Sequence, residues 1–235
     1  MSGHGGHVPK SRLGRIVNTF EESAIALLLG LMVTLTFVNV VARYVFNSTV
    51  IWGLEATLVL FAWLVLFGIS YAVKIGAHLG VDALLNVVSS PIRRLLTLAS
   101  ALAFLIYTLL LLKGAWDFWA PFGNLPPTSG RWFPTGFEDM KPWDYRGYVP
   151  VETIPIPEFM RPFLEWLLLF EGDEPFEKLP IVIPYLIVPV GVALLLFRVI
   201  QATVRLMRGE INSMIASHEA ESAVEELSAR HSEKD

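Results

Sequence analysis

His78 and Asp82 are the residues whose types and spacing come closest to a chemical site. Residues four apart share one face of a helix, and an imidazole beside a carboxylate is typical of a metal ligand pair or a proton relay. The same face continues with other polar residues at spacings of three or four, which are Lys74, Asn86 and Ser89 or Ser90. One histidine and one carboxylate are too few ligands for a zinc site. The pattern therefore favours a solvated helix face over a metal site.

Arg43 and Glu55 are a second pair of residues that could interact, because each stands at the edge of a long uncharged segment. A charge left without a partner in apolar surroundings is costly. Two interpretations stay open at this point. The two side chains pair with one another, or each reaches water independently.

The rest of the chain lacks the residue sets that most enzymes use. It has no cysteine, which excludes disulfides and thiolate metal sites. No long apolar segment contains a histidine, so bis-histidine haem ligation is excluded there. No glycine-rich phosphate loop, convincing Ser–His–acid set or basic patch interleaved with aromatics is present. We therefore predict no enzyme activity, no metal, no cofactor and no nucleic-acid partner.

Four uncharged apolar segments must position these residues. The chain of 235 residues is 54% hydrophobic and 17% charged, whereas a soluble domain carries about 25% charged residues. Each segment has 18 or 19 residues, close to the roughly 20 needed to cross a bilayer. The segments are Ala24–Ala42, Ala56–Val73, Leu95–Leu112 and Leu179–Phe197.

These segments predict an all-α integral membrane protein with four transmembrane helices. The expected helices are residues 20–43, 53–75, 93–115 and 179–205. They form one membrane domain over residues 20–208, with an extracytoplasmic insertion at 116–178. A flexible tail, 1–19, precedes this domain, and an acidic tail, 209–235, follows it.

Basic residues in the short flanking segments predict the orientation, because Lys and Arg near helix ends stay in the cytoplasm. The connection between the first two helices has only Arg43. The residues that would share the other side are Lys10, Arg12, Arg15, Lys74, Arg93, Arg94, Arg198, Arg205 and Arg208. We therefore expect both termini in the cytoplasm.

Two connections have compositions of their own. The polar stripe with His78 and Asp82 is flanked by apolar residues, which predicts a helix lying along the cytoplasmic membrane surface until Pro91. The insertion at 116–178 contains ten prolines and fifteen aromatic residues, a composition unsuited to helix interiors and too aromatic for a linker. We expect an irregular cap, with a short interfacial helix near 163–170. The cap either contacts a partner protein or rests on lipid headgroups.

Two helices contain residues that affect packing or shape. Gly68 and Ala72 are small residues four apart, which allow close helix approach. The last helix contains Pro184 and Pro189, and we expect it to bend near Pro189 and Gly191.

Several stretches together resemble the small membrane subunit of tripartite ATP-independent periplasmic (TRAP) transporters, the DctQ-like family. The resemblance covers residues 20–112 and 180–205. The family often has two adjacent acids after the tryptophan, whereas Leu54 precedes the single Glu55 here, and this insertion is longer than is usual in the family. The residues that carry the resemblance are Asn39–Asn47, Trp52, Glu55, Trp63, Gly68, Gly76–Asp82, Ile183–Tyr185 and Ile187–Gly191.

The resemblance implies a small permease subunit in the bacterial inner membrane. Its implied partners are a large membrane subunit, an extracytoplasmic solute-binding protein and membrane lipid. The implied driving force for transport through the large subunit is a sodium gradient. The implied substrate is an organic acid such as a C4-dicarboxylate or a sugar acid. Two alternatives are an anchor subunit of a redox complex and an independent four-helix scaffold or assembly factor. The structural or interaction candidates are Asn39, Arg43, Trp52, Glu55, Trp63, Gly68, His78, Asp82, Pro184, Pro189 and Gly191.

Overall fold

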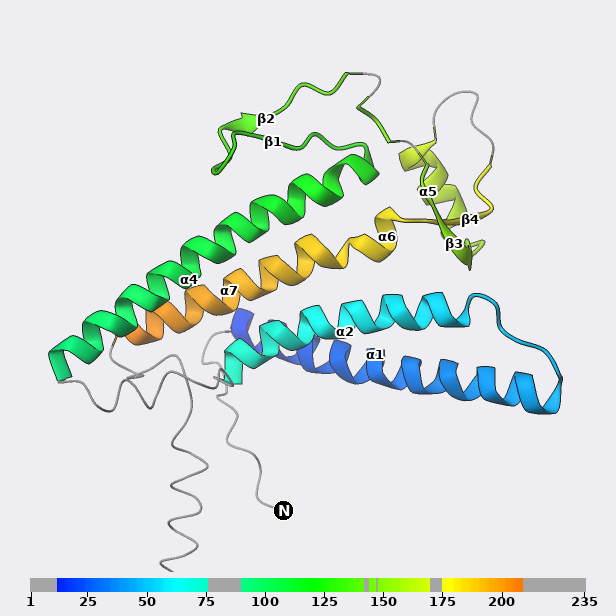
Figure 1. Cartoon of the computed structure of the whole chain (residues 1–235), viewed down its shortest axis with the longest axis horizontal. Helices are drawn as coiled ribbons and strands as arrows, with labels where there is room; N and C mark the ends of the chain where they lie inside the picture. Colours follow the sequence, from blue (N-terminus) through cyan, green and yellow to red (C-terminus); the bar gives the residue numbers. More distant parts are fainter. Residues whose placement is uncertain (1–11, 76–89, 142–143, 147, 170–174, 209–235) are drawn as a thin grey trace, which may run out of the picture.

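Four long apolar helices form the body of the molecule (Figure 1). The computed structural model describes residues 12–75, 90–141, 144–146, 148–169 and 175–208. The helices are α1 (Arg12–Val45), α2 (Gly53–Ile75), α4 (Ser90–Trp119) and α7 (Ile187–Met207), with α7 preceded by the short helix α6 (Val182–Tyr185). Each of the four is long and apolar enough to cross a membrane, which confirms the prediction of four such helices.

Helix α7 is the centre of the bundle. It packs against both α2 and α4, while α1 packs mainly against α2. One apolar cluster, built around Leu28, Phe67 and Ile187, joins α1, α2 and α7. A second, built around Val73, Leu195 and Val199, joins α2 to α7 with α4 beside it. Among the four long helices, the apolar stretch of α1 is therefore the one least covered by the described residues.

Two helices begin earlier than the apolar segments suggested. Helix α1 begins at Arg12 rather than near residue 20, and α4 begins at Ser90 rather than near 93. Backbone hydrogen bonding does not end where hydrophobicity ends, and Pro91 is favourable in a first helical turn. The expected surface helix, together with His78 and Asp82, falls in residues 76–89, outside the described residues, as do residues 1–11 and 209–235.

A cap, residues 120–181, connects α4 to α6. It begins with a 3₁₀ turn (Ala120–Gly123) and contains two antiparallel two-stranded sheets and helix α5 (Arg161–Leu168). Strand β1 (Thr128–Ser129) pairs with β2 (Gly136–Phe137), Thr128 opposite Phe137. Strand β3 (Pro150–Pro155) pairs with β4 (Lys178–Pro180). The insertion is thus more regular than its proline content suggested, because the described prolines lie at the ends of its elements or between them.

The half of the cap that contains β3, β4 and α5 has a small apolar core. Leu164 and Leu168 of α5 pack there with Phe122, Ile156, Phe176 and Val182. The rings of Tyr148 and Phe176 stack with centroids 3.9 Å apart. The Tyr148 hydroxyl donates to the Lys178 carbonyl and accepts from its N–H. Burial raises the pKa of that hydroxyl, the nearby Glu177 carboxylate adds to the rise, and the hydrogen bond that the hydroxyl oxygen accepts from the Lys178 N–H opposes it.

Candidate interaction sites

A buried ion pair joins three spanning helices at the end of the bundle away from the cap. Glu21 of α1 is 0% exposed and Arg198 of α7 is 3% exposed. One Glu21 carboxylate oxygen accepts from Nε and Nη2 of Arg198, and the other accepts from the Ser70 hydroxyl of α2 at 2.5 Å. Arg198 Nη1 donates to Gln201 at 3.0 Å. Both charges are therefore paired and hydrogen-bonded, as burial requires.

This pair was not predicted from the sequence. Glu21 and Arg198 lie just outside the uncharged segments Ala24–Ala42 and Leu179–Phe197, and Arg198 was interpreted only as one of the basic residues that favour an orientation. The signal that could have found them is their opposite sign at the same end of two apolar segments. An acid at such a place has no role in orientation and is costly near lipid unless it is paired.

Glu55 binds the cap and not Arg43. Its carboxylate accepts backbone N–H groups from Glu152, Thr153 and Ile154, at 2.9, 2.6 and 3.2 Å. The Thr153 hydroxyl adds a fourth hydrogen bond of 2.5 Å. Glu55 thereby fixes strand β3 over the start of α2.

The interpretation in which Arg43 pairs with Glu55 is thus corrected. Arg43 is exposed, and no ion pair joins it to Glu55 among the described residues. Backbone N–H groups of a strand edge need acceptors, and the Glu55 carboxylate supplies one acceptor to three of them. Sequence alone could not reveal this contact, because the partners lie about a hundred positions away.

Asn39 shapes the connection between α1 and α2. Its side-chain oxygen accepts the Val50 N–H at 3.2 Å, and the Val50 carbonyl accepts the Gly53 N–H at 2.9 Å. Asn47 adopts a left-handed backbone with φ of 48°, which asparagine tolerates better than most residues. Trp52, at the tip of this connection, is partly exposed.

Trp63 and the prolines define the junction of α2 with the last helix. Trp63 Nε1 donates to the Pro184 carbonyl at 2.9 Å. Pro189 has no N–H to offer to the carbonyl four residues earlier, and the helix is interrupted at Leu186, between α6 and α7. The indole bond therefore supplies a donor at a place where the helix pattern breaks.

Gly191 marks a close approach of α2 and α7. A Cβ added at Gly191 would lie 2.8 Å from the Cβ of Leu66, closer than real Cβ atoms come. By contrast, a Cβ added at Gly68 meets nothing within 4 Å. Gly191 therefore allows a contact inside this chain, whereas a methyl group at Gly68 would point into space that the described residues leave open.

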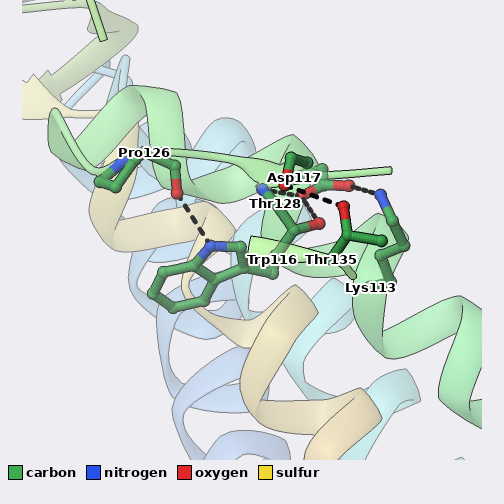
Figure 2. Close-up of polar contacts among 7 residues, drawn as sticks. Lys113, Trp116, Asp117, Pro126, Thr128 and Thr135 are labelled. Carbon is green, nitrogen blue, oxygen red and sulfur yellow. Dashed lines mark hydrogen bonds and ion pairs between the residues drawn. The ribbon is translucent and has the colours of Figure 1, made fainter. Parts of the chain in front are cut away.

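A polar cluster connects the cap to the end of α4 (Figure 2). Asp117 binds Lys113 Nζ at 2.5 Å through one oxygen. Its other oxygen accepts the Thr128 N–H at 2.7 Å and the Thr128 hydroxyl at 2.6 Å. Beside it, Trp116 Nε1 donates to the Pro126 carbonyl at 3.1 Å. These contacts fix the β1–β2 hairpin against α4.

The polar contacts described above connect one element to another. The Glu21, Glu55 and Asp117 carboxylates each accept hydrogen bonds from groups of the same chain. In the part of the chain that the structure describes, no three His, Cys, Asp or Glu residues gather as metal ligands would. These contacts hold the helix bundle and the cap together.

Comparison with known proteins gives consistent matches. Residues 32–137 match the family model for tripartite ATP-independent periplasmic transporters, DctQ component. A C4-dicarboxylate TRAP transporter small permease protein DctQ from Vibrio cholerae is 39% identical over 95% of this chain and 86% of its own length. The protein of the same description from Pseudomonas aeruginosa is 33% identical over 45% of this chain and 63% of its own length.

Proposed function

This chain belongs to the DctQ family of TRAP transporter small permease proteins, and from that premise we propose that it serves uptake of a C4-dicarboxylate. It acts beside a large membrane subunit that carries the substrate, driven by a sodium gradient. An extracytoplasmic solute-binding protein delivers the substrate. Because the chain belongs to this family, we no longer propose that it is an anchor of a redox complex or an independent scaffold.

One observation carries the substrate class. The alignment with the Vibrio cholerae protein, which is described as a C4-dicarboxylate small permease, covers 95% of this chain. It therefore has to run through the cap as well as the spanning helices. The likeness extends to the segment where this chain departs from the shorter connection usual in the family.

The contacts of the chain support a structural role beside the large subunit. A transport pathway needs ionisable groups or broken helices that face a substrate route. Here Glu21, Ser70 and Arg198 bind one another, and the helix interruption at Leu186 is covered by Trp63. These groups stabilise the bundle, and their hydrogen bonds to one another leave them no role in binding a dicarboxylate.

Helices α1 and α2 supply the surface for the large subunit in this proposal. Helix α1 exposes apolar side chains along its length, including Leu27, Val33 and Phe37. Gly68 of α2 has open space around it, so another helix can approach closely there. The remaining apolar surface faces lipid.

We also propose the orientation that the flanking basic residues favour. Both termini lie in the cytoplasm, and the cap lies outside the inner membrane, where the solute-binding protein arrives. Phe159, two residues before helix α5, and Phe163 and Trp166 of α5 are exposed on the surface of the cap. Exposed aromatic residues of this kind are enriched at protein interfaces, and they are the cap's contact surface in this proposal.

Co-purification tests the subunit assignment. The chain, tagged and expressed with the large subunit from the same transport system, is expected to retain it through detergent extraction and gel filtration. Gly68→Leu should weaken that retention. Gly114→Leu is the matched control, because Gly114 of α4 also has open space around it. If the chain purifies alone under conditions that keep both proteins folded, the assignment is wrong.

A further inference from the structure

The turn that joins β1 to β2 carries an uncovered aromatic tip. Trp132 is 64% exposed and Phe133 is 61% exposed. The turn is fixed and not loose, because Thr135 N–H donates to the Ser129 carbonyl at 2.9 Å. The hydroxyls of Ser129 and Thr135 are also hydrogen-bonded, at 3.1 Å. The tip is a built feature that nothing in the described chain covers.

The hairpin is attached to α4 just beyond the uncharged apolar stretch of that helix. The uncharged stretch ends at Leu112, and Asp117, which accepts hydrogen bonds from Thr128, lies five residues further along α4. At 1.5 Å per residue, this is about 8 Å along the helix axis. Figure 1 shows the hairpin running back alongside α4, toward the middle of the helix and not away from it. The tip, residues 131–133, lies three to five residues beyond Thr128, which carries it about 10 Å back along α4, toward the level of Leu112.

The helix face that leads away from this attachment is apolar and open. Residues at spacings of three or four share a helix face, so Leu102, Ile106 and Leu109 line up with Lys113 and Asp117. Leu102, Ile106 and Leu109 are all exposed. The hairpin therefore lies beside an open apolar face of α4, whose composition suits contact with lipid acyl chains.

The chemistry of the tip suits the boundary between headgroups and acyl chains. Tryptophan is enriched at that depth, and the Trp132 ring lies beneath the Arg131 guanidinium, with 5.7 Å from its carbon to the ring centroid. An arginine at this depth extends its charge toward lipid phosphates while its stem stays in apolar surroundings. We propose that the Arg131–Phe133 tip inserts into the phospholipid leaflet on the cap's side. It anchors the cap to lipid beside α4.

Depth measurement on a spin label tests this proposal. The chain has no cysteine, so single cysteines take the label without background. Trp132→Cys and Phe133→Cys are labelled separately, in full-length chain purified with the large subunit and placed in phospholipid nanodiscs. Glu158→Cys, on an exposed cap residue, is the water reference. Leu102→Cys, on the open face of α4, is the lipid reference.

Collisions of the label with oxygen and with a water-soluble nickel chelate give the result. The proposal expects positions 132 and 133 to meet oxygen several-fold more readily, relative to nickel, than position 158 does, approaching position 102. Nickel accessibility equal to that at 158 places the tip in water and overturns the proposal. A label shielded from both reagents when the large subunit is present, and exposed without it, shows a protein contact and also overturns it. Two adjacent label sites keep the test valid if one variant misfolds.

Discussion

At the scale of single residues, Glu21 and Arg198 form a buried ion pair that joins separate helices. Their charges are buried together, with Ser70 and Gln201 completing the hydrogen bonds. Whether such a pair adds net stability depends on what would replace it. Breaking it by removing one partner is unambiguous, because the other charge then stays buried without compensation. The pair therefore fixes how α1, α2 and α7 meet.

Single substitutions in this pair should cost more than their combination. Glu21→Ala and Arg198→Ala each strand one charge, at about 3 kcal/mol or more of unfolding free energy. The double variant should lose less than the sum of the two, since no charge is left alone. Steric trapping in bicelles measures these free energies. Strict additivity would show that the two side chains do not depend on one another.

Glu55 is a second residue with a clear structural role, because its carboxylate holds strand β3 by hydrogen bonds. Glu55→Ala removes a charged acceptor from three backbone N–H groups, and a lost charged hydrogen bond costs about 1.5 kcal/mol or more. Protease cleavage near residues 150–156 should then accelerate roughly tenfold, since about 1.4 kcal/mol is a factor of ten. Thr153→Val, which loses one hydroxyl contact, should have a smaller effect. Arg43→Ala is the control and should leave cleavage unchanged; acceleration equal to that of Glu55→Ala would contradict the assignment.

At the scale of elements, the close contact of α2 and α7 depends on a missing side chain. Gly191 leaves room for Leu66, and no other residue type could do so at the present separation. Gly68 illustrates the contrast, because a methyl group there meets no atom of the described chain. Gly191 therefore serves packing within the chain, whereas the open surface at Gly68 is available for packing against a helix of another protein.

Alanine at these two glycines should have opposite effects on the isolated chain. Gly191→Ala forces α2 and α7 apart, and overpacking of this kind costs about 1–3 kcal/mol. Gly68→Ala should be neutral, or stabilising by up to about 1 kcal/mol through helix propensity. Leu66→Ala combined with Gly191→Ala should recover part of the loss. Thermal unfolding in detergent ranks the four proteins, and equal stability of the two single variants would argue against the contact.

The sequence predicted elements well where one physical signal dominates. Long uncharged segments have a single explanation, so the four helices were predictable. Helix ends were not, because Arg12 and Ser90 begin helices beyond the apolar segments. The contacts of Glu55 with β3 and of Glu21 with Arg198 join residues 97 to 177 positions apart. No local pattern encodes such distances, which is why an Arg43–Glu55 pair, closer in sequence, looked reasonable.

At the scale of the whole molecule, the bundle has two different ends. The buried ion pair closes one end, and the cap covers the other. Cap and bundle are joined through Asp117 at α4 and Glu55 at α2, and at the same end Trp119 Nε1 of α4 donates to the Val182 carbonyl of α6 at 2.9 Å. The cap is therefore held against α2 and α4 on one side of the bundle.

The proposed orientation places that side outside the cell membrane. Single cysteines at Ser11, Glu158 and Ser228 can be tested with an impermeant thiol reagent on intact cells, since the native chain contains none. Label should appear at position 158 and should reach 11 and 228 only after the cells are opened. The reverse pattern would invert the topology, and with it the side on which the solute-binding protein is proposed to arrive.

Reconstituted uptake tests the central claim most directly. Proteoliposomes are prepared with the large subunit, with and without this chain, and supplied with the solute-binding protein, radiolabelled succinate and an inward sodium gradient. The account predicts sodium-dependent succinate accumulation when both membrane proteins are present, and little or none when this chain is left out. Equal accumulation by the large subunit alone, or no transport of any C4-dicarboxylate by the complete system, would contradict it.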